Sequence, residues 1–344
     1  MLRLRCLVLS SLAVVVGCGG GDDGALVDDD GGTEVGDDTG TEGGADGTTD
    51  TGGVATDTGV ATDTGAATDT GGVPTDTGPP PPPPPGCPAA PAGISPAALE
   101  AYAAVNAART GAGSPCAAVN AALDLAAEKH CEYYVANKKT ASCIANPHVE
   151  VSTCASFYAA NFNEREKKAG YTGSPSSEDM HFLGNAKSAV QGWIDTVYHR
   201  YPIIDPWTRE FGYGGAAGCD TMDFGAGAST PKTVVAVYPY DGQTNVPTSF
   251  NGAESPAPPA PPTGWPSGYV LGVHYTGTLS VYTITKAGTT TPIPVLTVPK
   301  LSYQSNATFF YTHKPLEKGT KYLMHAEGNN GAAWKKDWSF TTAP

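Results

Sequence analysis

The feature that most constrains this 344-residue chain is the stretch of residues 19–86, which has almost no large apolar side chains. Glycine, aspartate and threonine dominate it, and seven consecutive prolines stand at positions 79–85. Such a segment buries too little apolar surface to offset the entropy lost on ordering. A proline run of this length favours an extended polyproline II rod of roughly 22 Å. We therefore predict that residues 18–86 form a disordered tether and that folded structure begins after it.

Within the tether, Thr-Asp-Thr-Gly recurs at positions 49, 56, 62, 68 and 75. Repeated Asp and Gly could bind calcium, but the repeat lacks the apolar position with which calcium-binding repeats build a core. A self-repelling spacer is the favoured interpretation. Residues 19–78 also hold fifteen acidic and no basic residues, which leaves 19 acidic and 18 basic residues from Pro79 onward. The folded part is therefore nearly neutral, and no nucleic-acid partner is predicted.

The amino terminus indicates export. Two arginines precede an apolar run at residues 7–16, which is too short to span a bilayer and is typical of a secretory signal. The closing Val-Val-Gly-Cys, with Cys18, resembles a bacterial lipobox, although an ordinary signal peptide with an incidental cysteine is the alternative. The resemblance implies a signal peptide over residues 1–17 and lipid attachment at Cys18. It implies a protein anchored in the bacterial envelope, at the outer membrane or cell surface.

Six further cysteines stand between residues 87 and 219. In an exported chain an even number favours disulfides, and the irregular spacings without any CxxC pair argue against a zinc cluster. We predict three disulfides and leave the pairing open among Cys87, Cys116, Cys131, Cys143, Cys154 and Cys219.

Hydrophobic spacing predicts two successive regions, an α+β domain at 87–238 and an all-β domain at 239–344. Helices are expected from Ser95-Pro96 to about residue 110, at 117–137, at 157–169 and at 186–197, with a loop at 172–179 and a break at 202–206. Strands are expected at 211–218 and 234–238. Six more are expected at 269–275, 278–285, 295–298, 307–312, 321–327 and 334–341. His130 falls on an apolar helix face, so we interpret it as a core residue.

Several motifs resemble, in order and spacing, those of the CAP superfamily (SCP domain), the family of cysteine-rich secretory proteins, antigen 5 and pathogenesis-related proteins. They are VNAAR at 105–109, LDLAAEKH at 123–130, AGY at 169–171, SEDM at 177–180, GWI…VYHR at 192–200, IIDP at 203–206 and FGYG at 211–214. The resemblance implies a CAP-type α/β/α sandwich, with helices around a small antiparallel sheet.

The resemblance also implies a cleft with two histidines and two glutamates, whose histidines can hold zinc. The matching positions are His148 and His199 as metal ligands and Glu178 as the first glutamate, the one candidate general base. Val197 stands where the second glutamate is expected, unless Asp195 or Glu150 replaces it. The incomplete set favours a binding module for a lipid or protein ligand over an enzyme. The alternatives are a metal-dependent hydrolase of envelope material and a structural envelope protein.

The last domain resembles bacterial immunoglobulin-like modules that follow CAP domains. Its entry reads YPYDGQTNVP at 238–247, and its exit reads PLEKGTKY at 315–322 and WSFTT at 338–342. The resemblance implies a β-sandwich, and no cluster of catalytic residue types is visible in it. The oligomeric state stays open.

Overall fold

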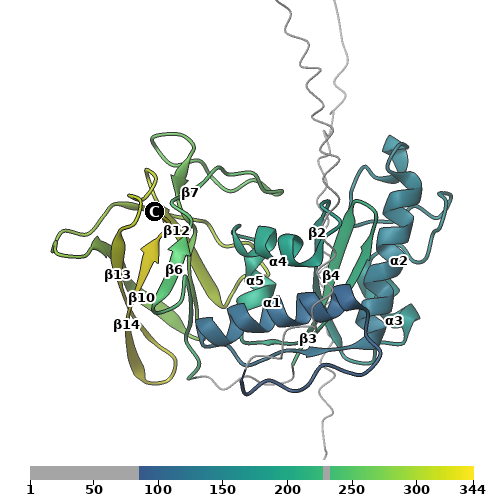
Figure 1. Ribbon diagram of the computed structural model, residues 1–344, viewed down its shortest axis with the longest axis horizontal. Helices are drawn as coiled ribbons and strands as arrows, with labels where there is room; N and C mark the ends of the chain where they lie inside the picture. Colours follow the sequence, from purple (N-terminus) through teal and green to yellow (C-terminus); the bar gives the residue numbers. More distant parts are fainter. Residues whose placement is uncertain (1–84, 228–232) are drawn as a thin grey trace, which may run out of the picture. The chain divides into compact units, whose positions relative to one another are not determined.

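All helices of the described chain lie in its first half, together with a small sheet, and the second half consists of strands (Figure 1). This computed structural model describes residues 85–227 and 233–344, so the predicted signal peptide, the lipid attachment at Cys18 and the tether lie outside the described residues. The helices are α1 (Pro96–Ala112), α2 (Ala121–Asn137), the 3-10 turn η1 (Ala141–Cys143), α3 (Phe162–Ala169), α4 (Ala186–Ile194) and α5 (Arg200–Ile204). None in the described ranges is long and apolar enough to cross a bilayer.

The strands of the first half are β1 (Ala118–Val119), β2 (Ser174–His181), β3 (Thr208–Ala216) and β4 (Cys219–Ala226). They form one sheet in the order β1-β3-β4-β2, in which only the short β1–β3 pair is parallel. The mixed α and β composition predicted from the sequence is confirmed.

Helices pack on both faces of this sheet, as the alternation of side chains along β3 shows. Phe211 and Tyr213 belong to the core shared with α1 and α4, and the Phe211 ring stacks on Tyr102 of α1. Gly212 and Gly214 face α2: a Cβ on either would stand 2.1 Å from Asp124 N or 2.0 Å from Glu128 N. Helix α2 therefore lies directly on the backbone of β3, and any side chain at these two glycines would push it away.

The helix termini follow the capping signals in the sequence. The Ser95 side chain accepts a hydrogen bond from Ala98 N, Pro96 opens α1, and Gly113 ends it in the left-handed conformation. The third helix begins at Phe162 and not at 157, because the Asn161 side chain caps it by accepting from Glu164 N. The capping side chain, rather than the apolar spacing upstream, thus decides where this helix starts.

Three sequence predictions in the first half were wrong. Residues 174–181, predicted mostly as loop, form β2, and residues 219–226, which lie between the predicted strands 211–218 and 234–238, form β4. Polar residues dominate β2, so it lacks the apolar alternation that indicates a strand, and its charges are buried only because partners surround them. The third error was the helix break at 202–206: α5 includes Pro202, which is tolerated because first-turn N–H groups have no intrahelical acceptor.

All six strands predicted in the second half are present: β9 (Leu271–His274), β10 (Thr278–Lys286), β11 (Val295–Thr297), β12 (Ala307–Thr312), β13 (Lys321–Asn329) and β14 (Ala333–Thr342). The strand predicted at 234–238 is present as β5 (Ala236–Tyr238), and the structure adds β6 (Gln243–Val246), β7 (Ser249–Phe250) and β8 (Ser267–Gly268). They form two four-stranded sheets, β10-β13-β14-β6 and β11-β12-β9-β5, and the pair β7-β8. Because β5 pairs with β9, residues at the end of the first region belong to a sheet of the second.

One hydrophobic core continues from the first region into the second, and all described residues fall in one compact unit. Arg200 connects the two regions. Its Nη1 donates to Val270 O at 2.7 Å and its Nε to Ile194 O, while the guanidinium lies over the rings of Tyr238 and Tyr269. The buried cation is thus held by backbone carbonyls and aromatic faces from both regions.

The six cysteines form three disulfides, as predicted, and the structure supplies the pairing that the sequence left open. Cys87 bonds to Cys116, Cys131 to Cys219 and Cys143 to Cys154. The second of these joins α2 to the start of β4, and the third closes a short loop between α2 and α3.

Candidate functional site

Two adjacent acids of β2 face opposite sides of the sheet and belong to different clusters. In the register with β4, Glu178 lies opposite Asp223 and Asp179 lies opposite Met222. Successive side chains of a strand point to opposite faces. Glu178 accordingly meets residues of α2 and α3, whereas Asp179 interacts with Glu254 from the second region.

The Glu178 carboxylate is surrounded by positive partners. It lies 2.9 Å from Nδ1 of His148 and 2.5 Å from Nη2 of Arg165, and Nε2 of His130 is 3.7 Å away. Only 1% of the Glu178 side chain is exposed, against 37% of that of His148. Burial by itself would raise the pKa of Glu178, but the charge of Arg165, then those of His130 and His148, hold it well below its usual value.

Two neighbouring acids of this cluster, Glu166 and Asp223, have raised pKa values. Burial, and then the charge of Glu178, raise the pKa of Glu166 to about 8. Burial and the charges of Glu178 and Glu166 raise the pKa of Asp223 well above its usual value. The cluster therefore combines one carboxylate whose pKa is held low beside an arginine with two carboxyl groups whose pKa values are raised. Glu178 is a weak base in this setting because the charge of Arg165 lowers its pKa, and burial also separates it from solvent water.

His130, predicted to be a core histidine, is fully buried in the same cluster. Its Nδ1 lies 2.9 Å from Glu150 and its Nε2 lies 2.8 Å from the carbonyl of Pro147. Glu150, one of the two acids considered as a replacement at position 197, also accepts from Tyr158 N and Ala159 N. Glu150 is thus hydrogen-bonded to His130 and to the neighbouring loop, and does not pair with His199.

The second histidine of the predicted pair, His199, meets a residue that the sequence did not indicate. Its Nδ1 lies 2.9 Å from Oε1 of Glu254, which precedes the proline-rich segment of the second region. The same carboxylate accepts from the backbone N–H groups of Val197 at 2.9 Å, Tyr198 at 2.6 Å and His199 at 3.1 Å. The Glu254 side chain is fully buried and that of His199 is 18% exposed.

Glu254 and Asp179 form the acidic part of this second cluster. Burial, then the charges of Glu254 and Glu178, raise the pKa of Asp179 well above its usual value, so the protonated form of Asp179 is favoured beside Glu254. Because Glu254 accepts from His199 Nδ1–H, the Nε2 nitrogen is the one left to meet a ligand. Asp195, the other considered replacement, instead accepts from the hydroxyl of Tyr269 at 2.7 Å.

The structure therefore pairs His148 with Glu178 and His199 with Glu254, on opposite faces of β2. Within residues 85–227 and 233–344, no group of three or more His, Cys, Asp or Glu side chains is arranged to hold a metal ion. Glu254 had one signal in the sequence: it is the only acid between Asp241 and Glu317. The sequence did not indicate that Glu254 pairs with His199, because the two residues lie 55 positions apart.

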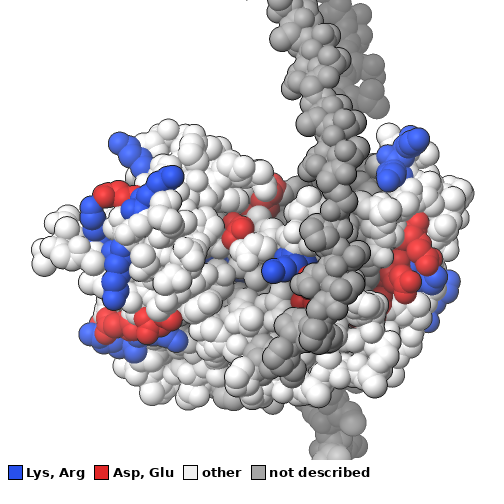
Figure 2. Space-filling view, viewed as in Figure 1, with Lys and Arg blue, Asp and Glu red and all other residues white. Residues whose placement is uncertain are grey.

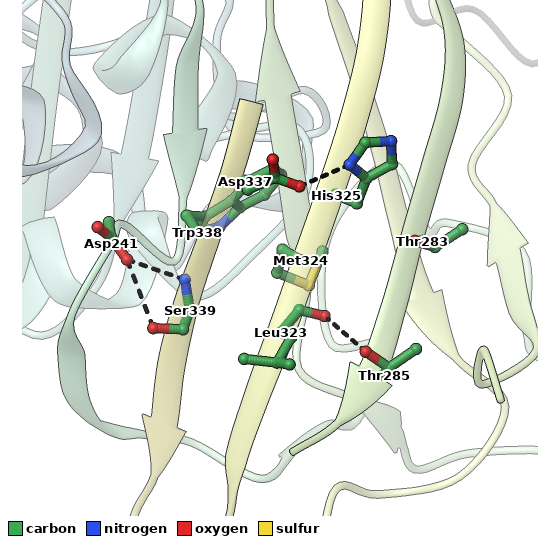
Figure 3. Close-up of a pocket in the computed structure, with 9 residues that line it drawn as sticks. All are labelled: Asp241, Thr283, Thr285, Leu323, Met324, His325, Asp337, Trp338 and Ser339. Carbon is green, nitrogen blue, oxygen red and sulfur yellow. Dashed lines mark hydrogen bonds and ion pairs between the residues drawn. The ribbon is translucent and has the colours of Figure 1, made fainter. Parts of the chain in front are cut away.

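Two surface hollows lie outside these clusters. A groove of about 250 Å³ adjoins the Glu254 segment and is lined by Asp195, Thr196, Pro247, Ser249, Phe250, Asn251, Ala253 and Tyr269. A wider, open groove of about 460 Å³ lies on β10, β13 and β14, where His325 lies 2.7 Å from Asp337 (Figure 3). The wider groove shares no residue with either histidine–carboxylate cluster, so size alone does not identify the functional surface.

Comparison with known proteins matches part of this chain. The model of the cysteine-rich secretory protein family, CAP, matches residues 102–238. These residues are a CAP domain. A crystal structure of an extracellular protein containing an SCP domain from Bacillus anthracis str. Ames is similar at 15% identity and a TM-score of 0.33. The match covers 38% of this chain and 40% of that one, so less than half of the other protein is spanned. No curated protein matches the chain.

Proposed function

We propose that this protein is an exported lipoprotein, attached to the bacterial envelope through Cys18, whose CAP domain is a non-catalytic binding module. The observation that supports this most is the state of Glu178. The one candidate general base is 1% exposed, ion-paired with Arg165, and has a pKa well below its usual value. A general base needs access to the proton it removes and a pKa near the working pH.

The two histidines suit binding better than hydrolysis. Each has Nδ1 fixed by a carboxylate and side-chain surface open to solvent, 37% for His148 and 18% for His199. A histidine held in this way presents Nε2 as a fixed hydrogen-bonding atom to a lipid headgroup or a peptide. Zinc bound by these nitrogens would supply Lewis-acid chemistry, but the pairs lie on opposite faces of β2. As arranged, they do not fit one shared zinc site, and we derive no reaction from it.

We also infer that the two sheets of residues 239–344 form an immunoglobulin-like β-sandwich that supports the CAP domain. The continuous core and the contacts of Arg200 and Glu254 favour a fixed attachment over a flexible one. In this proposal the second region orients His199 through the buried Glu254 and supplies no chemistry of its own.

The proposal is tested with the full chain carrying Cys18→Ser, incubated with a total lipid extract and repurified. We expect lipid to remain bound at one molecule per chain, and His148→Ala or His199→Ala to reduce the bound amount severalfold. Calorimetric titration with zinc is run in parallel. Tight zinc binding that both substitutions abolish, together with cleavage of envelope material by the wild type, would overturn the proposal in favour of the hydrolase.

The anchor is tested separately by labelling cells with an alkyne fatty acid. Label should appear on the wild-type chain and be absent from Cys18→Ser. An unlabelled wild type contradicts the lipoprotein assignment and leaves the binding proposal for the CAP domain to its own test.

A further inference from the structure

Large apolar side chains are exposed mainly on two loops of the CAP domain. Among described residues, nine large apolar side chains are exposed by more than a third, and five of them stand on these loops: Val149 (37%), Val151 (38%), Phe157 (38%), Phe182 (47%) and Leu183 (57%). The first loop, 144–157, lies between η1 and α3. The second, 182–185, joins β2 to α4. Single exposed apolar residues are common on protein surfaces, but five in two loops are an unusual concentration.

Both loops are attached to the carboxyl-terminal end of α2. The Tyr133 hydroxyl donates to Cys143 O at 2.7 Å and accepts from Val151 N at 2.9 Å, and Asn137 Nδ2 donates to Ala155 O at 2.8 Å. These contacts hold the first loop against the last turn of the helix, so its apolar residues lie at that end of the domain.

The second loop reaches the same helix end. The ring of Phe182 packs on that of Tyr134 with centroids 4.7 Å apart. A Cβ on Gly184 would stand 2.9 Å from Gly218 N, and a Cβ on Gly218 would stand 4.0 Å from the ammonium of Lys138. The two loops and the first residues after α2 therefore form one surface, here called the α2-end surface: Lys138, Lys139, Val149, Val151, Phe157, Phe182 and Leu183.

The exposed charges of the α2-end surface are positive. Lys138 and Lys139 are exposed, and the only acid in residues 133–163 is Glu150, which is buried against His130. Exposed Glu132, one turn earlier on α2, is paired with Lys129 at 2.7 Å. Figure 2 shows basic side chains over the upper end of α2 with uncharged surface around them, while acidic side chains gather lower on that side.

We propose that the α2-end surface docks on a lipid bilayer that carries anionic headgroups. Aliphatic and phenyl side chains at loop tips can enter the boundary between headgroups and acyl chains, and flanking lysines are attracted to anionic lipid. A protein partner is disfavoured by composition, because interface hot spots are rich in Trp, Tyr and Arg. No such residue is among the exposed side chains that define this surface. The inference does not depend on the ligand-binding function proposed above.

The test measures sedimentation of the full chain carrying Cys18→Ser with two kinds of vesicle. One contains phosphatidylcholine alone and the other equal amounts of phosphatidylcholine and phosphatidylglycerol. We expect partitioning into the anionic vesicles only. Phe182→Ser combined with Leu183→Ser should reduce it at least tenfold. Lys138→Gln and Lys139→Gln should each reduce it by about fivefold, as expected for one lysine near an anionic surface.

The matched control is Val281→Ser combined with Leu323→Ser, two side chains of similar exposure (38% and 41%) on the sheet of the second region. All variants share the same amino terminus, so its contribution cancels, and thermal unfolding confirms that each is folded. Equal binding to both vesicles, no binding to either, or a control that loses as much as the Phe182 and Leu183 variant would each overturn the proposal.

Discussion

Replacing Glu254 with alanine should destabilise the whole described unit, although Glu254 lies in a loop of the second region. Its carboxylate accepts four hydrogen bonds, three from backbone N–H groups at Val197, Tyr198 and His199 and one from the His199 ring. Alanine would leave all four donors without this acceptor at a position where the glutamate side chain is fully buried.

The magnitude follows from the number of donors. A buried donor that loses its partner costs about 1–3 kcal/mol, and water entering the vacated space recovers part of that cost. We therefore expect the free energy of unfolding to fall by about 3–5 kcal/mol. Typical domains are stable by only about 5–15 kcal/mol. Glu254→Gln should cost less, because one amide oxygen still accepts while the amide nitrogen faces donors.

Urea unfolding followed by tryptophan fluorescence measures this change. The matched control is Glu317→Ala. Glu317 forms an ion pair with Lys286 at 2.5 Å, but its side chain is 64% exposed. An exposed pair contributes about 1 kcal/mol or less. A loss below 1 kcal/mol for Glu254→Ala, or one equal to that of the Glu317 control, would refute the reasoning that Glu254 connects the two regions.

Three further predictions concern the CAP domain. Glu166 holds its proton in the folded state, with a pKa of about 8 against 4.5 when unfolded, so stability should fall as pH rises from about 4.5 to 8. Over this range, each pH unit lowers the free energy of unfolding by about 1.4 kcal/mol. Urea titrations at several pH values should show that Glu166→Gln removes this pH dependence; an unchanged dependence in the variant would contradict the raised pKa of Glu166. Replacing Cys131 and Cys219 together by serine should lower the free energy of unfolding by about 4–5 kcal/mol, since the bond closes a loop with a sequence separation of 88; an unchanged midpoint would mean that the bond does not form. Gly214→Ala should cost about 2–4 kcal/mol, since its Cβ would stand 2.0 Å from Glu128 N; a wild-type melting temperature would contradict the close helix–sheet contact.

Much of the fold could be predicted because local signals agree with the tertiary structure. Ser95-Pro96 and Gly113 mark both ends of α1, and runs of β-branched and aromatic residues between turns identified six strands of the second half. The missed strand β2 shows where such reasoning fails. Its residues, SPSSEDMH, are stable there because Arg165 and the histidines neutralise Glu178 and because β4 pairs with the backbone. Those partners are distant in sequence and leave no local pattern.

The candidate site was predictable only in part for the same reason. The resemblance indicated His148, Glu178 and His199, and the structure places each beside a carboxylate or a base. Strand alternation, however, directs Glu178 and Asp179 to opposite faces of the sheet. The carboxylate that hydrogen-bonds His199 is Glu254, which comes from the second region. A search for a replacement near position 197 could find only Asp195 and Glu150, which have other partners.

The origin of Glu254 has a practical consequence for how this protein can be divided. The CAP family match ends at residue 238, and a gene fragment ending there would look complete by that measure. Such a fragment would lack the acceptor for three backbone N–H groups and the residue that orients His199. It would also expose the apolar faces that Tyr269 and Val270 cover. If a truncated CAP domain fails to bind a ligand, the absence of the Glu254 segment is therefore sufficient to explain the failure. The result would be no evidence against binding by the intact chain.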